Sequence, residues 1–229
     1  MVSGESDAEG VFTLALHRES GQGIVLTAND PELCTSACLD DAGARLVSSD
    51  DQGSALWDLH SGQRSTLSAT RLQCVGLGTD GYTILLQSPS STAEGALWTA
   101  SFDALLPARI LAEHSPSSIL TGGQSPWTTS FPIVDNAIFL LEPTAAPGYQ
   151  RLLRTPLDGS PATLLAEAQF GPPMLPANGM WIRPDGRTLE YIASVDDLWA
   201  IFRVSLDGSS PPVELMRHNG ELVMELQFD

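Results

Sequence analysis

The sequence contains no lysine, and its 11 basic residues stand against 28 aspartates and glutamates, giving a net charge of −17. A strongly negative chain is poorly suited to a nucleic-acid backbone, because affinity for phosphates depends on cations that release counterions. An anionic membrane surface is disfavoured for the same electrostatic reason. The charge therefore argues against nucleic-acid and membrane partners and favours a cationic or neutral partner, either a protein or a small-molecule ligand.

Cysteine is also scarce, with only Cys34, Cys38 and Cys74. An odd number of cysteines without metal-ligand spacing is a poor basis for a disulfide framework. Cys34 and Cys38 fall on one expected strand, where side chains four residues apart lie about 13 Å from each other. That distance is too long for a disulfide. We therefore expect three reduced, buried thiols in a cytosolic protein.

Long apolar runs and targeting signals are missing as well. No run approaches the roughly 18 apolar residues of a membrane span. Residues 1–7 carry neither the basic region nor the apolar core of a signal peptide, so we expect a cytoplasmic location. The 20 glycines and 16 prolines are spread along the chain, which indicates many turns within a single domain spanning residues 1–229.

One segment type recurs five times: an apolar strand, a turn rich in glycine, aspartate or serine, and a second apolar strand. The copies begin near residues 11, 55, 96, 150 and 200, and propeller blades repeat about every 40 to 50 residues. Each hairpin is preceded by a turn and one further strand. Before that turn an inner strand is expected, at residues 35–39, 74–77, 131–134 and 180–183. This pattern predicts an all-β chain folded as a β-propeller of about five four-stranded blades.

The two ends of the sequence match different parts of this repeat. Residues 1–10 match the second strand of a blade and its turn, whereas residues 222–229 match an inner strand. We therefore expect the N- and C-terminal strands to pair in one blade and close the ring, which would remove exposed sheet edges. The alternative is that the sequence comes from a longer propeller and was cut at both ends at the same point of the repeat.

Two stretches resemble known propeller repeats. Residues 46–59 look like part of a WD40 repeat, including its Trp57–Asp58 pair, although the Gly-His dipeptide of that family is absent. Residues 183–187, with Pro184-Asp185-Gly186, followed by residues 201–208, are similar to the TolB-type repeat. The resemblance implies a rigid ring that serves as a non-catalytic binding scaffold on its loop face or at its channel mouth, an inference by fold analogy.

In such a ring the inner strands line the channel, and two sets of loops gather on one face. One set is expected at residues 5–10, 50–54, 88–95, 142–149 and 194–197, and the other includes residues 29–33, 70–73, 113–130 and 167–179. The long stretch 113–130, with His114 and Trp127, is a candidate binding loop or an irregular wrap over the ring. Trp57 and Trp98 occupy equivalent positions and are expected in the core between blades.

Trp181 and Arg183 lie two residues apart on an expected inner strand, so their side chains point to the same side. An aromatic ring beside a guanidinium suits a carboxylate or sugar-like ligand. The alternative is that Trp181 packs between blades.

Acidic residues recur at short spacing, at positions 5, 7 and 9, 50 and 51, and 196 and 197. They form a negative rim, provide oxygen ligands for Ca²⁺, or serve ordinary turn chemistry. No histidine pair, nucleophile elbow or phosphate loop occurs, so we expect no metal and no cofactor and assign no catalytic residue. The alternative function is an enzyme of hydrolase or lyase type at the channel mouth, for which Asp135 and Glu225 are the main candidate acids. The sequence indicates no oligomeric state.

Overall fold

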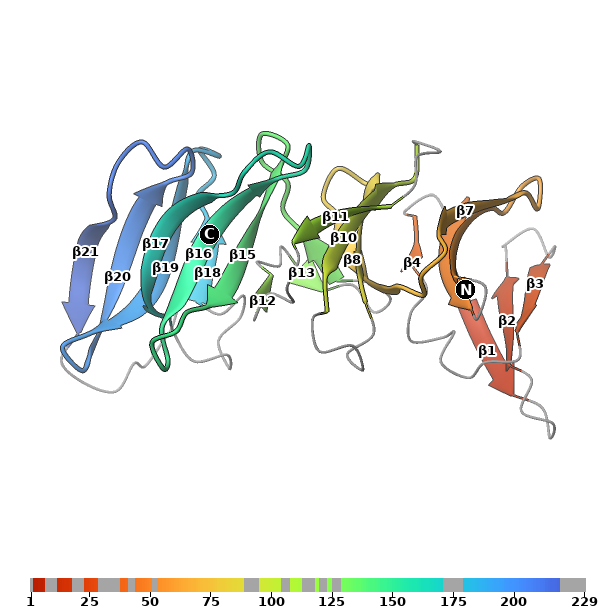
Figure 1. Cartoon of the computed structure of the whole chain (residues 1–229), viewed down its shortest axis with the longest axis horizontal. Helices are drawn as coiled ribbons and strands as arrows, with labels where there is room; N and C mark the ends of the chain where they lie inside the picture. The colour runs from red at the N-terminus through yellow and green to blue at the C-terminus, as the bar shows by residue number, and fades with distance from the viewer. Residues whose placement is uncertain are drawn as a thin grey trace. The chain divides into compact units, whose positions relative to one another are not determined.

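The structure is a computed structural model that describes residues 2–6, 12–17, 23–28, 38–40, 44–50, 53–88, 95–103, 108–112, 118–119, 123–124, 129–170 and 179–218. All named secondary-structure elements in this part of the chain are β-strands (Figure 1). Within these residues, no helix is long and apolar enough to span a membrane. The chain divides into two compact units, one of Met1–Ser115 with Gly123–Ser130 and the other of Pro116–Gly122 with Phe131–Asp229.

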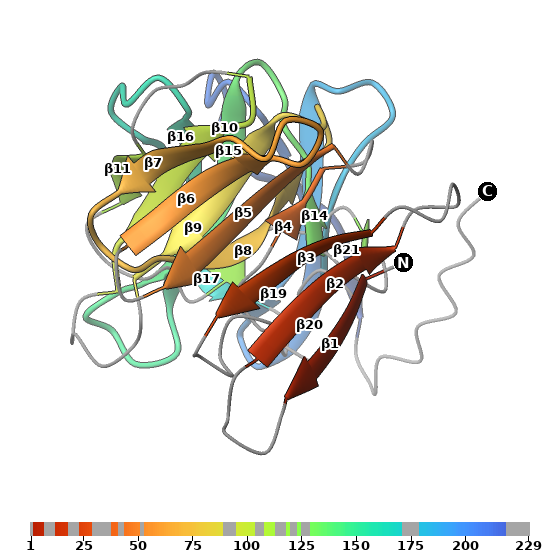
Figure 2. The ribbon, with the colours of Figure 1, turned by 90° about the vertical axis from the view of Figure 1, so that its right-hand side faces the viewer.

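The first unit contains three antiparallel sheets, two of which are seen with their strands side by side in Figure 2. The first sheet consists of β1 (Val2–Ser6), β2 (Phe12–His17) and β3 (Gly23–Ala28). The second consists of β4 (Cys38–Leu39), β5 (Arg45–Asp50), β6 (Gly53–Asp58) and β7 (Arg64–Ser68). The third consists of β8 (Gln73–Gly78), β9 (Thr83–Gln87), β10 (Leu97–Ser101) and β11 (Arg109–Ala112), and β14 (Thr129–Phe131) and β13 (Gly123–Gln124) extend it beyond β8.

The second unit contains one continuous sheet made of two blade-like groups. The first group is β12 (Ser118–Ile119), β15 (Ala137–Pro143), β16 (Gln150–Pro156) and β17 (Thr163–Phe170). The second is β18 (Met180–Ile182), β19 (Thr188–Val195), β20 (Leu198–Ser205) and β21 (Val213–His218). The end of β17 pairs with β19 through Gln169 and Phe170, whereas β18 pairs with the opposite end of β19. Both β17 and β18 therefore pair with the same edge of β19, and this pairing joins the two groups into one sheet.

The prediction of an all-β chain made of propeller-type blades is confirmed. All five predicted hairpins are present as antiparallel pairs, namely β2–β3, β6–β7, β10–β11, β16–β17 and β20–β21. The sheet β1–β3 has three strands among the described residues. The segment predicted to complete it, residues 222–229, lies outside them, so the closure and the count of five blades stay predictions.

The inner strand predicted at residues 131–134 is wrong in its pairing. Val134 makes only an isolated bridge to Ala137, while β14 pairs with β8 of the preceding sheet. The inner neighbour of β15 is instead β12, which lies within the long predicted loop at 113–130. Pro132 accounts for the difference, because proline has no N–H with which to continue a hairpin ladder.

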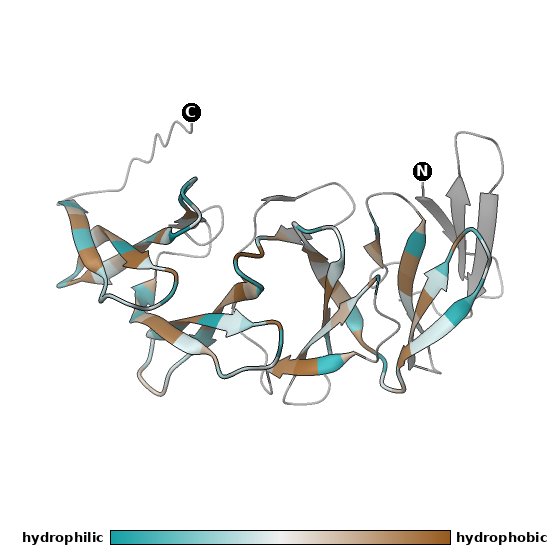
Figure 3. Ribbon diagram, turned by 90° about the horizontal axis from the view of Figure 1, so that it is seen from above, coloured by the Kyte–Doolittle hydropathy of each residue, from teal (hydrophilic) through white to brown (hydrophobic). Residues whose placement is uncertain are grey.

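Each unit has its own core. In the first unit, buried side chains from consecutive sheets pack together, including Val47, Leu56, Ile84 and Leu86. In the second, the core is a cluster that includes Phe139, Leu152, Leu189, Tyr191 and Val204. Apolar and hydrophilic stretches both occur along the strands (Figure 3), and β15 and β19 each contain five consecutive buried residues, so these strands are buried on both faces. Trp98 packs against the core of the first unit, and Trp57 is partly buried. Their indole N–H groups donate to Ser88 and Ser48, which supports the predicted equivalence of the two positions.

Aspartates hold the predicted Asp-Gly turns together. Asp80, Asp185 and Asp207 each accept backbone N–H groups from residues two or three positions later, at 2.8 to 3.2 Å. The glycine that follows each of them has φ between 62° and 74°, a region that favours glycine. Hydrogen bonds from Ser205 and Ser209 lower the pKa of Asp207 to about 2. Backbone N–H groups likewise lower the pKa values of Asp58 and Asp185.

These depressed pKa values predict acid sensitivity. A carboxylate whose pKa is lower in the folded chain than in the unfolded chain stabilises the fold above about pH 4. For Asp207 that stabilisation is lost as the pH falls from about 4 to about 2. We expect the melting temperature to fall over this range, and to fall less in Asp207→Asn. Thermal unfolding at several pH values checks this, with Asp135→Asn as the control. Equal acid slopes in all three proteins would contradict the prediction.

Candidate functional site

Trp181 and Arg183, the two candidates on the predicted inner strand, converge on a buried carboxylate. The register of β18, β19 and β20 places Trp181 opposite Glu190 and Glu190 opposite Arg203. The indole Nε1 of Trp181 donates to Glu190 Oε2 at 2.9 Å, and Arg203 donates to Oε1 through Nε at 2.9 Å and Nη2 at 2.5 Å. Arg183 Nε lies 3.8 Å from the same oxygen. We call Trp181, Arg183, Glu190 and Arg203 the Glu190 ladder.

The Glu190 ladder satisfies its own polar groups. Glu190 is only 6% exposed and has a hydrogen-bonded cation beside it, as a buried charge requires. The N–H of Trp181 is used within the sheet. The indole N–H is thus committed to the sheet, while both a ligand at Trp181 and Arg183 and the packing of Trp181 between blades stay predictions.

Among the other four candidates, Asp135 is the one that the structure describes, and it does not join this cluster. Asp135 is exposed in a two-residue turn with Asn136, where φ is 49° and 56°. Its carbonyl oxygen accepts a hydrogen bond from Arg154 at 3.0 Å. His114, Trp127 and Glu225 lie outside the described residues. Asp135 is thus placed by turn geometry rather than on a strand.

A groove of about 580 Å³ lies in the second unit. Sequence analysis did not predict it as a pocket. Its described lining comes from the connection between β15 and β16, the end of β17, the hairpin of β19 and β20, and the residue before β21. The lining residues are Tyr149, Glu167, Ala168, Gln169, Tyr191, Ala193, Ser194, Val195, Asp196, Asp197, Phe202 and Pro212.

Local hydrogen bonding positions the rim of this groove. Tyr149 closes a short loop in which its carbonyl oxygen accepts the N–H of Thr144, and its own N–H donates to Ala146, both at 3.1 Å. Asp196 and Asp197 form the tip of the β19–β20 hairpin with φ of 52° and 60°. Two consecutive residues with positive φ are typical of a type I′ turn, in which aspartate is favoured. The pair of acids therefore fits the turn chemistry considered for it.

The floor of the groove is aromatic. The rings of Tyr191 and Phe202 are stacked with centroids 5.4 Å apart, and the ring of Phe170 lies 5.1 Å from that of Tyr191 on the other side. Burial raises the pKa of Tyr191 to about 12, so its phenol stays protonated at neutral pH. Tyr191 is only 3% exposed and is thus suited to packing beneath the groove rather than to proton abstraction.

Three carboxylates, those of Glu167, Asp196 and Asp197, line the groove and are exposed. Asp196 accepts a hydrogen bond from Arg217 at 3.3 Å, but Arg217 is also held by Glu214 at 2.7 and 3.0 Å. Arg151 is the cross-strand neighbour of Glu167, but its guanidinium forms an ion pair with Glu142 instead. The lining itself contains no arginine or histidine among the described residues, so the groove is acidic.

Three of the predicted loops meet in this groove. Residues 142–149 contribute Tyr149, residues 167–179 contribute Glu167 to Gln169, and residues 194–197 contribute all four of their members. The repeat pattern thus located the rim. The floor residues Tyr191 and Phe202 were missed because they lie in strands, where an aromatic side chain is ordinarily read as core.

Within the described ranges, no group of three or more histidine, cysteine, aspartate or glutamate side chains is placed to hold a metal ion. Of the acids considered as Ca²⁺ ligands, the side chains at positions 5, 7, 9, 50 and 51 lie outside the described part of the structure.

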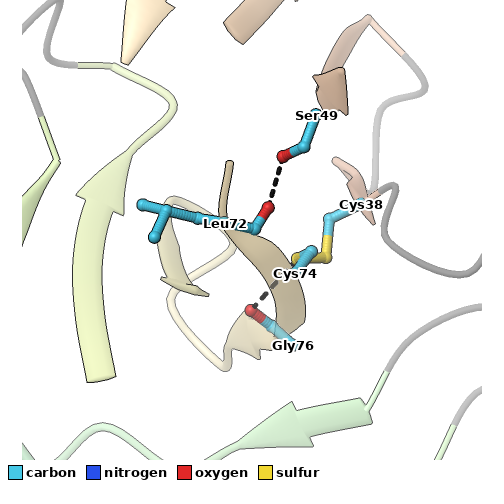
Figure 4. The surroundings of a disulfide bond; sticks show 5 residues. All are labelled: Cys38, Ser49, Leu72, Cys74 and Gly76. Carbon is cyan, nitrogen blue, oxygen red and sulfur yellow. Dashed lines mark hydrogen bonds between the residues drawn. A yellow bond between two sulfur atoms is a disulfide. The ribbon is translucent and has the colours of Figure 1, made fainter. Parts of the chain in front are cut away.

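The expectation of three reduced thiols is wrong. Cys38 on β4 and Cys74 on β8 form a disulfide (Figure 4), with Cα atoms 5.9 Å apart, inside the usual range. Close by, the hydroxyl of Ser49 donates to the carbonyl oxygen of Leu72. The two cysteines are 36 residues apart and belong to neighbouring sheets, so sequence spacing gave no sign of the pairing. Cys34 lies outside the described residues.

No family model matches the chain, and no curated protein matches it. Among solved structures, the chain is similar to TolB from Acinetobacter baumannii (11% identity, TM-score 0.38), covering 90% of this chain and 61% of TolB. It is also similar to an oligogalacturonate lyase in complex with manganese (9%, TM-score 0.46), covering 96% and 73%. A third is the β-propeller domain of the trilobed protease from Pyrococcus furiosus (10%, TM-score 0.47), covering 88% and 64%. The chain thus spans about three fifths of TolB.

Proposed function

We propose that this protein is a non-catalytic binding module whose groove in the second unit holds a segment of a partner protein or peptide. The observation that carries the proposal is the groove itself: an exposed acidic rim above a stacked aromatic floor. Aromatic side chains supply a large contact area, and a few polar groups at a rim fix the orientation of what binds. Rigid strands and a hydrogen-bonded loop hold these side chains in place, which lowers the entropic cost of binding.

The lining supports binding better than catalysis. Ser194 and Tyr191 carry hydroxyl groups, but the described lining offers no histidine to activate them. The alternative of a hydrolase or lyase relied on Asp135 and Glu225. Asp135 lies exposed in a turn, and Glu225 lies outside the described residues, so no observation favours that alternative.

A peptide array of random sequences tests the proposal directly. We expect the labelled protein to retain a set of peptides, and Tyr149→Ala to weaken their binding about fivefold or more, as truncation of an interface tyrosine commonly does. Tyr82→Ala is the matched control, because Tyr82 is 54% exposed in the other unit and Tyr149 is 42% exposed. Circular dichroism should show that both variants are folded. An array without retained peptides, or equal losses in both variants, would refute the groove as the binding site.

A further inference from the structure

Resting on the proposed function, we infer that the occupant of the groove is an extended peptide segment carrying an arginine at one end of the groove and an apolar residue about four positions away at the other. The inference follows from the way the strand registers distribute charge and aromatic surface along the groove. It names a ligand class, a basic and apolar peptide segment, rather than a partner.

One end of the groove is acidic. Asp196 and Asp197 form the hairpin tip, and Gln169 pairs with Ser194 beside that tip. Since β17 runs antiparallel to β19, Glu167 lies further toward the same tip. Among the described residues neither Glu167 nor Asp197 makes an ion pair with an arginine. Two carboxylates free of such pairing, with the exposed ring of Tyr149 on the same rim, suit a guanidinium, which forms bidentate bonds with carboxylates and stacks on aromatic faces.

The other end is apolar. Tyr191 stands opposite Phe202 in the register of β19 and β20, and Pro212 comes directly before Val213, which pairs with Arg203. Tyr191 and Phe202 therefore lie opposite each other on neighbouring strands, and Pro212 lies two residues before Glu214, the partner of Phe202. The ring of Phe202 is partly exposed and stacks on that of Tyr191, which is only 3% exposed, and no charged side chain contributes to the lining at this level among the described residues. An aliphatic or aromatic side chain gains most from such a surface.

The register fixes the spacing between these ends. Asp197 directly precedes Leu198, and Phe202 lies four residues further along β20. At about 3.3 Å per residue the two ends are roughly 13 to 17 Å apart, the span of about four or five residues of extended peptide. The overall charge of −17 adds long-range attraction for a basic segment.

A double-mutant cycle tests the inference against this general attraction. The probe is a labelled nine-residue peptide of glycine and serine with one arginine and, four positions later, one leucine. Its partner peptide has glutamine in place of the arginine. The groove variant Glu167→Gln/Asp196→Asn/Asp197→Asn removes three charges, and asparagine keeps the left-handed turn. The matched control Asp80→Asn/Asp103→Asn/Asp135→Asn also removes three charges outside the lining, one of them in a turn of the same kind.

Fluorescence anisotropy at low salt gives the affinities. With the unmodified protein and the control variant, we expect the change from arginine to glutamine to weaken binding about tenfold, as for a paired interfacial charge. With the groove variant, we expect the same change to weaken binding less than about twofold, since paired groups are not additive. Replacing the leucine with serine should weaken binding to all three proteins.

Two results would overturn the inference. A tenfold loss with the groove variant as well would mean that net charge, not the groove, recognises the arginine. No binding of the probe, combined with array peptides that depend on Tyr149 but lack arginine, would reject the ligand class and leave the proposed function standing. If the array retains nothing, the proposed function and the inference fall together.

Discussion

Replacing Cys38 and Cys74 together with alanine is expected to lower the free energy of unfolding by about 3 to 4 kcal/mol. The disulfide closes a 36-residue loop, and a cross-link of that length removes considerable conformational entropy from the unfolded chain. Urea unfolding of the two proteins measures the difference. A reducing agent should destabilise the unmodified protein by a similar amount and leave the double variant unchanged.

Thiol titration in denaturant provides the control. With three cysteines in the chain and two in the disulfide, one reactive thiol is expected before reduction and three after it. Cys34→Ala should abolish the first signal without altering the response to reductant. Three reactive thiols before reduction would contradict the pairing. Because such disulfides persist mainly in oxidising compartments, confirmation would favour an oxidising location over the cytoplasmic one expected from the sequence.

Glu190→Ala is expected to destabilise the second unit by about 3 kcal/mol. The substitution leaves the Trp181 N–H without its acceptor and removes the carboxylate shared by Arg203 and Arg183. Both arginine side chains are nearly half exposed, at 44% and 47%, so water reaches them and keeps the loss below that of a fully buried pair. Thermal and urea unfolding measure the effect.

Glu142→Ala is the matched control for that experiment. Glu142 also pairs with an arginine across two strands, Arg151, at 3.3 Å, but near the surface. Its loss should cost about 0.5 kcal/mol or less, as for exposed ion pairs. Equal small effects of the two substitutions would show that the Glu190 ladder is not structural. Trp181 and Arg183 would then again become leading candidates for ligand contact.

The hairpins were predictable because their signals are local. Apolar strands that flank turns rich in glycine, aspartate or serine specify β6–β7, β16–β17 and β20–β21 within about 20 residues of sequence, where turn chemistry and alternation agree. The same signals located the turn of Asp196 and Asp197, and hence part of the groove. Such patterns report which residues turn and which pair with their nearest neighbours.

Long-range pairings were not predictable in this way. The disulfide depends on how β4 and β8 of successive sheets approach each other, and Glu190 looked like an ordinary strand residue until the register placed it between Trp181 and Arg203. Likewise, β12 takes the inner position beside β15 although only two of its residues pair. Two residues carry too little periodicity to stand out in a loop.

The disulfide has a topological consequence for limited proteolysis. The covalent loop from Cys38 to Cys74 contains the whole of β5, β6 and β7, and the turn at residues 60–63, followed by Arg64, is exposed at its tip. Trypsin cutting after Arg64, the first residue of β7, would separate β6 from the rest of β7 along the chain, but the disulfide would keep the two fragments joined. The nicked protein would behave as a two-chain molecule that runs as a single species until reductant releases the fragments.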